Sequence, residues 1–98
     1  MKESQITEFK ASWRDEYLKH LCAFANTRGG RLFIGVADDG NVVGVKEIKK
    51  LLEDIPNKAI NYLGIIVDVH LIEGSGKEYL EIVIPQSSVP IAYKGVYL

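Results

Sequence analysis

Three acidic side chains near the start of the chain carry the most direct indication of chemistry in this sequence. Glu3 and Glu8 bracket a predicted N-terminal strand, and Asp38 follows a second, apolar strand. If these strands are neighbours, the three carboxylates converge and could bind Mg²⁺ or Mn²⁺, which would clamp a phosphodiester and activate a water. The alternative is a solvated Glu3, a Glu8 paired with a nearby cation, and turn residues at Asp38 and Asp39. On spacing alone, this second interpretation is favoured.

Four cations lie in the same part of the sequence as these acids. Lys10, Arg14, Arg28 and Arg31, with Trp13 as a stacking ring, could form a patch that contacts phosphates. Trp13 is more simply explained as a packed residue at the start of a helix. Arg28 is the strongest candidate of the four, because it stands on a glycine-flanked turn where backbone N–H groups could also face an anion.

Other common sites lack support in the sequence. Gly29, Gly30 and Gly35 do not have the spacing of a phosphate-binding loop, and no Lys-Ser or Lys-Thr pair follows them. Nucleotide hydrolysis is therefore not expected. One cysteine and two distant histidines cannot close a tetrahedral zinc site. Cys22 lies on an apolar helix face and is predicted to be a packed thiol.

Length and composition limit the class of protein. The 98 residues predict one domain over residues 1–98, with apolar and charged contents ordinary for a globular protein. A single cysteine excludes an internal disulfide framework, which favours the reducing cytoplasm. No apolar run is long enough to span a membrane. A net charge of −1 means that nucleic acid would have to bind a local patch, or other domains of a longer protein.

The spacing of apolar residues predicts alternating strands and helices. Ser12, three residues before Asp15, predicts the start of the first helix. Pro56 interrupts the second helical stripe, so we expect one kinked helix or two abutting helices, ended by Gly64. The predicted strands cover residues 5–10, 31–37, 42–45, 65–72 and 78–84, and the predicted helices cover residues 12–26 and 48–63.

With strand pattern also in residues 91–98, the order of elements is β-α-β-β-α-β-β-β, which predicts an α+β fold in which two main helices pack against a mixed β-sheet. The central strand over residues 31–37 is apolar on both faces, so both faces should be covered. Residues 91–98 have the pattern of a hairpin cut off in its second strand. We therefore expect the chain to be the N-terminal piece of a longer protein.

Three motifs give the chain a family resemblance: E-S-x-x-x-E-F-K, F-A-N-T-x-G-G and I-G-V-x-D-D-G. With them, the chain resembles the Schlafen-type, Alba-like (AlbA_2) domain. This is the N-terminal DNA-binding domain of many bacterial proteins described as transcriptional regulators or RecG-like helicase relatives. The match continues through KKLLEDIPNK, GKEYLEI and VPIAYKG, so it covers nearly the whole chain.

The resemblance implies more than one function. In bacterial members the domain is described as a DNA-binding module. In animal Schlafen proteins, two related domains together form an RNA endonuclease with three metal-binding acidic residues. Those three positions fall on Glu3 and Glu8 in the first motif and on Asp38 after the I-G-V strand. The chain lacks the second domain copy and the extended basic cradle of those nucleases.

The first interpretation is thus a non-enzymatic nucleic-acid-binding module of a bacterial regulator or helicase-related protein, using Lys10, Arg14, Arg28 and Arg31. We expect DNA before RNA as the ligand, a homodimer, and no membrane. One alternative is a metal-dependent nuclease, or its inactive relative, with Mg²⁺ or Mn²⁺ on the acidic trio. Another is a dimerisation or interaction platform. No cofactor is expected unless the domain is a metal-dependent nuclease.

Overall fold

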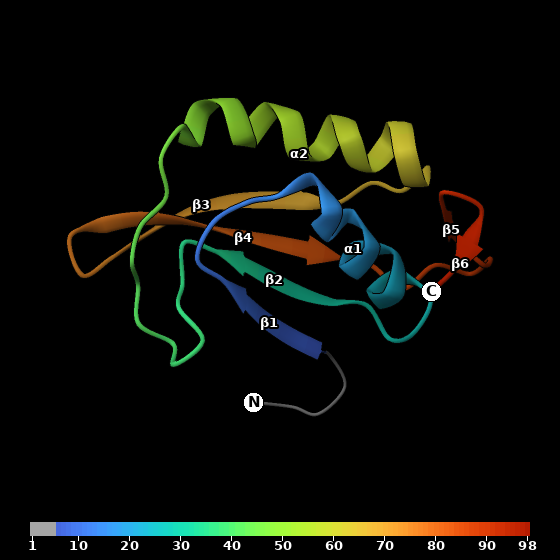
Figure 1. Ribbon diagram of the computed structural model, residues 1–98, viewed down its shortest axis with the longest axis horizontal. Coiled ribbons are helices and arrows are strands. Elements are labelled where there is room, and N and C mark those ends of the chain that lie inside the picture. Colours follow the sequence, from blue (N-terminus) through green and yellow to red (C-terminus); the bar gives the residue numbers. More distant parts are fainter. Residues whose placement is uncertain (1–5) are drawn as a thin grey trace.

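The structure is a computed structural model that describes residues 6–98. It confirms the predicted α+β class, with two helices and a mixed four-stranded sheet (Figure 1). The elements in chain order are β1 (Ile6–Lys10), a 3₁₀ turn (Asp15–Tyr17), α1 (Leu18–Ala25), β2 (Gly30–Ile34), α2 (Ile48–Leu63), β3 (Asp68–Gly74), β4 (Lys77–Ile84), β5 (Ala92–Tyr93) and β6 (Val96–Tyr97).

The main sheet has the strand order β1-β2-β4-β3. β1 runs parallel to β2, while β2 and β3 both run antiparallel to β4. β5 and β6 form a separate two-stranded hairpin. Because β1 and β2 are parallel, their first residues lie at one end of the sheet and their last residues at the other. This fixes where the predicted site residues can meet.

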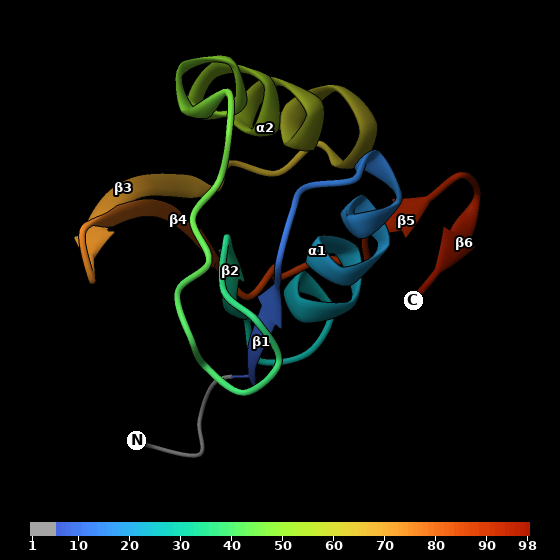
Figure 2. The same cartoon turned by 60° about the vertical axis from the view of Figure 1, so that its left-hand side comes forward.

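Both helices cover the same face of the sheet (Figures 1 and 2). Alternate residues of β2 and β4 point into this helix-side face and are fully buried there: Leu32, Ile34, Leu80, Ile82 and Ile84. The helices contribute buried residues to the same cluster, among them Leu21 and Ile55. The amphipathic pattern of each helix and the period-two pattern of each strand thus meet in one core.

The opposite face differs from the prediction that both faces would be covered. In the described part of the chain no helix packs on it (Figure 2), and Phe33 on β2 and Tyr79 on β4 remain half-buried. The loop after β2 reaches over part of this face, where a Cβ on Gly40 would lie 4.0 Å from Cε2 of Phe9. We call this side of the sheet the open face.

The short strand predicted over residues 42–45 is reduced to a single bridge between Val36 and Val42. Gly44 has a φ of 82°, a left-handed conformation that ends regular pairing there. The next residue, Val45, donates its N–H to the carbonyl of Glu78 on β4, at 3.0 Å, and no longer follows the β2 segment. The Asp39-Gly40 turn is present, since the Gly40 N–H donates to the carbonyl of Ala37 at 2.8 Å.

The two helices keep the predicted positions but differ in detail. The first begins as the 3₁₀ turn at Asp15, and no side chain caps it, so the expected Ser12–Asp15 capping arrangement is wrong. α2 continues through Pro56 as one helix. It ends at Gly64, as predicted, where a φ of 68° provides the left-handed cap. The strand predicted from residue 65 begins later, at Asp68.

The end of α1 is tied to the C-terminal segment through one amide side chain. Asn26 accepts a hydrogen bond from the Ile91 N–H at 2.7 Å and donates to the Ile91 and Leu98 carbonyls at 2.7 and 3.0 Å. Cys22 is fully buried one turn earlier, with its Sγ 3.2 Å from the Ile91 carbonyl, so it is a packed thiol as predicted. These contacts hold residues 91–98 against the helix.

Candidate nucleic-acid interface

The turn between α1 and β2 holds two exposed arginines, Arg28 and Arg31, on either side of two buried glycines. Gly29 has a φ of 75°, and a Cβ there would lie 2.5 Å from the carbonyl oxygen of Ile84. A Cβ on Gly30 would lie 2.7 Å from the carbonyl oxygen of Ile6. Neighbouring backbone therefore confines the turn on both sides, and only glycine fits. The backbone path of this turn is therefore closely constrained, with one exposed arginine before the two glycines and another after them.

Arg31 lies on the open face of the sheet. It pairs with Val83 in the β2–β4 register, one residue out of phase with the buried Leu32. Its Nη1 lies 3.6 Å from Oε2 of Glu81, while 47% of the Arg31 side chain stays exposed. A single ion pair at this distance leaves most of the guanidinium's donors available to a ligand.

Lys10 and Arg14 lie away from this turn. Lys10 ends β1 and pairs with Ile34, so it faces the helix side, with its Nζ 5.0 Å from the centre of the Tyr17 ring. Arg14 lies 3.6 Å from Glu16 and is largely exposed. The four predicted cations thus form two pairs at opposite ends of the parallel β1–β2 unit, not one continuous patch.

Trp13 packs against the protein, as predicted. Its ring lies against Tyr17 in an edge-on arrangement with centroids 6.0 Å apart, and the ring is half-buried beside the core. The indole N–H donates to Oδ1 of Asp15 at 2.9 Å. A ring held on one side and at its N–H is poorly placed to serve as a free stacking surface.

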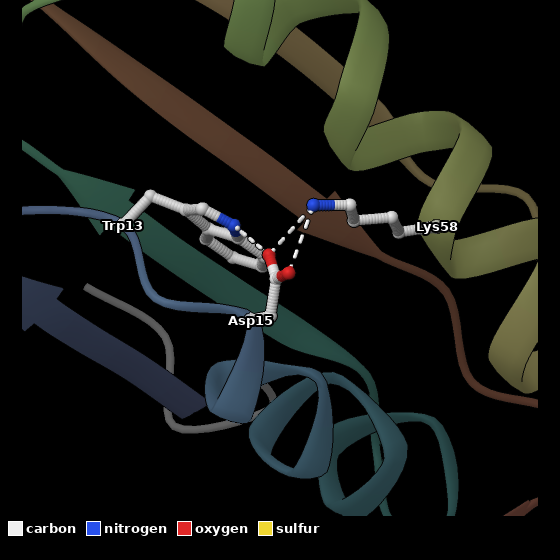
Figure 3. Close-up of polar contacts among 3 residues, drawn as sticks. All are labelled: Trp13, Asp15 and Lys58. Carbon is white, nitrogen blue, oxygen red and sulfur yellow. Dashed lines mark hydrogen bonds and ion pairs between the residues drawn. The ribbon is translucent and has the colours of Figure 1, made fainter.

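Asp15 connects the start of the first helix to α2 (Figure 3). The ammonium of Lys58 donates to both Asp15 carboxylate oxygens, at 2.8 and 2.9 Å. The hydrogen bonds from Lys58 and then from Trp13 lower the pKa of Asp15, and the bond to Asp15 raises the pKa of Lys58. Sequence reasoning missed this pair, because its members are 43 residues apart and share no motif.

Of the predicted acidic trio, Glu3 lies outside the described residues. Glu8 pairs with the buried Leu32, so it is on the helix side of the edge strand β1. Nearby, burial and then the charge of Lys10 lower the pKa of His20, while the charge of Glu8 acts in the opposite direction. Glu8 therefore lies on the helix side of the sheet, close enough to His20 of α1 to influence its charge.

Asp38 and Asp39 are exposed in the turn after β2. Asp39 accepts hydrogen bonds from the backbone N–H and the side-chain amide of Asn41, at 2.9 and 2.8 Å, which confirms it as a turn residue. Residues 6–98 contain no group of three or more histidine, cysteine, aspartate or glutamate side chains that could hold a metal. The trio that includes Glu3 stays a prediction.

Comparison with protein families decides the assignment. The profile of the family described as Schlafen, AlbA_2 matches residues 3–97, which is nearly the whole chain. The chain belongs to the AlbA_2 family. The match includes all three motifs from which the resemblance was inferred.

Two solved structures share the AlbA_2 fold of this chain. A crystal structure of the DIP2311 protein from Corynebacterium diphtheriae matches with a TM-score of 0.77 and 20% identity, over 95% of this chain and 20% of that one. A solution structure of the N-terminal domain of a RecG-related protein from Nitrosomonas europaea matches with a TM-score of 0.74 and 24% identity, over 100% of this chain and 76% of that one. The chain thus spans about a fifth of the Corynebacterium chain.

The open face of this AlbA_2 domain carries a feature that sequence reasoning missed. The rings of Phe9, Phe33 and Tyr79 come from β1, β2 and β4 and follow one another across the sheet. The ring centroids are 5.7 Å apart for Phe9 and Phe33 and 6.2 Å apart for Phe33 and Tyr79. We call these three residues the aromatic row. The only signal in the sequence was an aromatic residue within each of three strands, and it gives no strand order.

Proposed function

We propose that this AlbA_2 domain is a nucleic-acid-binding module of a helicase-related or regulatory protein. The observation that carries the proposal is the confined turn with an exposed arginine before and after its two glycines, Arg28 and Arg31. Family membership supports it, as does the structural neighbour named for its relation to the DNA helicase RecG.

The chemistry of the turn suits a phosphate backbone. An arginine guanidinium can donate two parallel hydrogen bonds to a phosphate, which adds orientation as well as charge. Because the turn is confined by Ile84 and Ile6, binding orders only the side chains and not the backbone. With a net charge of −1, attraction comes from this local site and not from the charge of the whole domain.

The finer parts of the proposal are DNA before RNA, a homodimer and a cytoplasmic location. Pairing of two copies would double a small basic site, which supports the dimer. Among the helices of residues 6–98, none has the length and apolar character needed to cross a bilayer.

A double variant tests the proposed site. Arg28→Ala with Arg31→Ala should weaken binding to both duplex and single-stranded oligonucleotides by about tenfold or more. The slope of log affinity against log salt should fall by about two units, one for each lost phosphate contact. Fluorescence anisotropy between about 50 and 200 mM salt measures both quantities.

The matched control is Lys49→Ala with Lys50→Ala, which removes the same charge from the exposed side of α2. It should leave the affinity and its salt slope close to those of the unchanged protein. An unchanged affinity in the arginine double variant, for duplex and single strand alike, would show that the turn is not the binding site.

A further inference from the structure

We propose that the open face is a stacking platform for the unpaired bases of a single-stranded nucleic acid, with the aromatic row as its surface. The inference rests on the proposed function and deepens it, because it names the form of nucleic acid that the domain takes. Its stacking surface is made of different residues from the arginine turn, with Arg31 common to both.

The aromatic row has the geometry of a platform. Phe9 and Phe33 are paired in the β1–β2 register, and Tyr79 is two residues from Glu81, the β4 partner of Phe33, so the three side chains share the open face. Neighbouring rings are tilted by 55° and 47°, so they form a row of separate ring faces and not one flat surface. Aromatic side chains on one face of a four-stranded sheet can stack two or three splayed bases, and every base offers a π-face for this contact. A duplex keeps its base faces covered by its own stacking, so the row can engage only unpaired bases.

The size of the row favours bases over a protein partner. Each aromatic side chain carries about 150–250 Å² of surface, and here each ring is already half-buried. Three such rings offer well under the roughly 800 Å² per partner that a stable protein interface buries. A nucleic-acid base that stacks on a single ring does not need an interface of that area.

The groove beside the row has a matching size. It has a volume of about 240 Å³ and lies between the aromatic rings and the loop at Gly40 and Val42. This is smaller than the roughly 300–1,000 Å³ of sites that enclose a whole small molecule. A single planar ring system fits that space, while the sugar and phosphate attached to it would remain outside.

Charge next to the row complements the phosphates of such a strand. Arg31 is two residues before Phe33 on β2, so its partly exposed guanidinium is on the same face as the ring. The ion pair with Glu81 places the guanidinium over the sheet, beside the row. A strand whose bases stack on the row can thus have its backbone within reach of Arg31.

Leucine substitutions test the row while keeping an apolar residue in the sheet. Phe33→Leu and Tyr79→Leu should each weaken binding of a labelled single strand of about 12 nucleotides by about tenfold. That is ~1.4 kcal/mol, within the range for one stacked base. Tyr79→Phe, which keeps the ring, should bind like the unchanged chain. Binding to the corresponding duplex should not change in any of these variants.

Tyr62→Leu is the matched control, because Tyr62 is 59% exposed on α2, away from the sheet. Unchanged single-strand affinity in Phe33→Leu and Tyr79→Leu would overturn the platform. If the arginine double variant still lost affinity, the proposed function would stand without it. If the unchanged chain bound neither duplex nor single strand, both proposals would fail.

An NMR measurement on the unchanged chain tests the platform without relying on variants that must fold correctly. Titration with the same single strand should move the ring-proton NMR signals of Phe9, Phe33 and Tyr79 upfield, as base stacking requires. Titration with the duplex should leave those signals in place. Ring signals that do not move at saturating single strand would contradict the inference, whatever the variants show.

Discussion

At the scale of single residues, Asp15 illustrates how position decides the role of a carboxylate. Its negative charge lies in the first turn of a helical segment, where acidic side chains are favoured. Both of its oxygens are engaged by Lys58, and one also accepts from Trp13 (Figure 3). Asp15 therefore joins the start of the first helix to α2 and is a structural residue, although its charge and exposure resemble those of a site residue.

The lowered pKa of Asp15 predicts a pH-dependent contribution to stability. A carboxyl whose pKa is lower in the folded state stabilises the fold above its unfolded pKa, about 3.9. That contribution is lost as the pH falls through the lower, folded value. Asp15→Asn should therefore reduce the free energy of unfolding near pH 7 by at most about 1 kcal/mol, because the pair is exposed.

Urea unfolding at a series of pH values measures this effect, and the difference between Asp15→Asn and the unchanged chain should shrink below about pH 4. Glu53→Gln, which changes an exposed acid on α2, is the control and should show no such trend. A difference that persisted unchanged at about pH 2 would mean that Asp15 acts through packing and not through charge.

Residue roles that depend on local chemistry were predictable from the sequence, while roles that depend on distant partners were not. The turn role of Asp39 is predictable because aspartate commonly accepts a hydrogen bond from the backbone two residues on, and Asn41 is that partner. The apolar neighbours of Cys22 in the sequence likewise predict a packed thiol, and the residue is fully buried. The Asp15–Lys58 pair forms only because the tertiary fold brings two distant segments together, and no short motif in the sequence specifies that contact.

At the scale of elements, α2 shows that packing can overcome an unfavourable residue. Pro56 has no N–H to donate and its ring crowds the preceding turn, yet the helix runs unbroken from Ile48 to Leu63. Ile55, Ala59 and Leu63 are buried along one side of the helix, on both sides of the proline. Their burial holds the two halves in line, which is why the sequence could not decide between one helix and two.

Replacing this proline should stabilise the helix. Pro56→Ala restores a backbone donor in the helix interior, so we expect the free energy of unfolding to rise by about 1 kcal/mol or more. Chemical denaturation measures the change, with Asn57→Ala at the next, exposed position as the control for helix propensity alone. A loss of stability in Pro56→Ala would indicate that the proline shapes the helix for its contact with the sheet.

Most elements were predictable from periodicity, but their arrangement was not. The strands at β1, β2 and β4 and both helices follow their apolar spacing. The segment at residues 42–45 has strand composition, yet the left-handed Gly44 directs Val45 to β4. The open face was predicted to be covered because Phe33 is apolar; local pattern cannot say which face receives the helices.

At the scale of the whole molecule, the binding and nuclease interpretations differ in their response to metal. We expect the chain to bind labelled DNA or RNA equally well with Mn²⁺ or with a chelator, and to leave both intact. Gel electrophoresis and anisotropy on the same samples measure cleavage and binding together. Mn²⁺-dependent cleavage that disappears in both Glu8→Gln and Asp38→Asn would establish the acidic trio as a metal site instead.

The hydrogen bonds of Asn26 have a consequence for how the chain is made. They reach partners 65 and 72 residues further on, and β2 likewise waits for β4 before its second edge is paired. During synthesis, α1 and β2 therefore leave the ribosome long before the residues that complete their packing. Until residues 80–98 have emerged, β2 can pair on one edge alone, with β1, and the Asn26 side chain lacks these partners. The domain should thus complete its packing only after residues 80–98 have emerged, and its exposed strand edge makes aggregation a greater risk before that point.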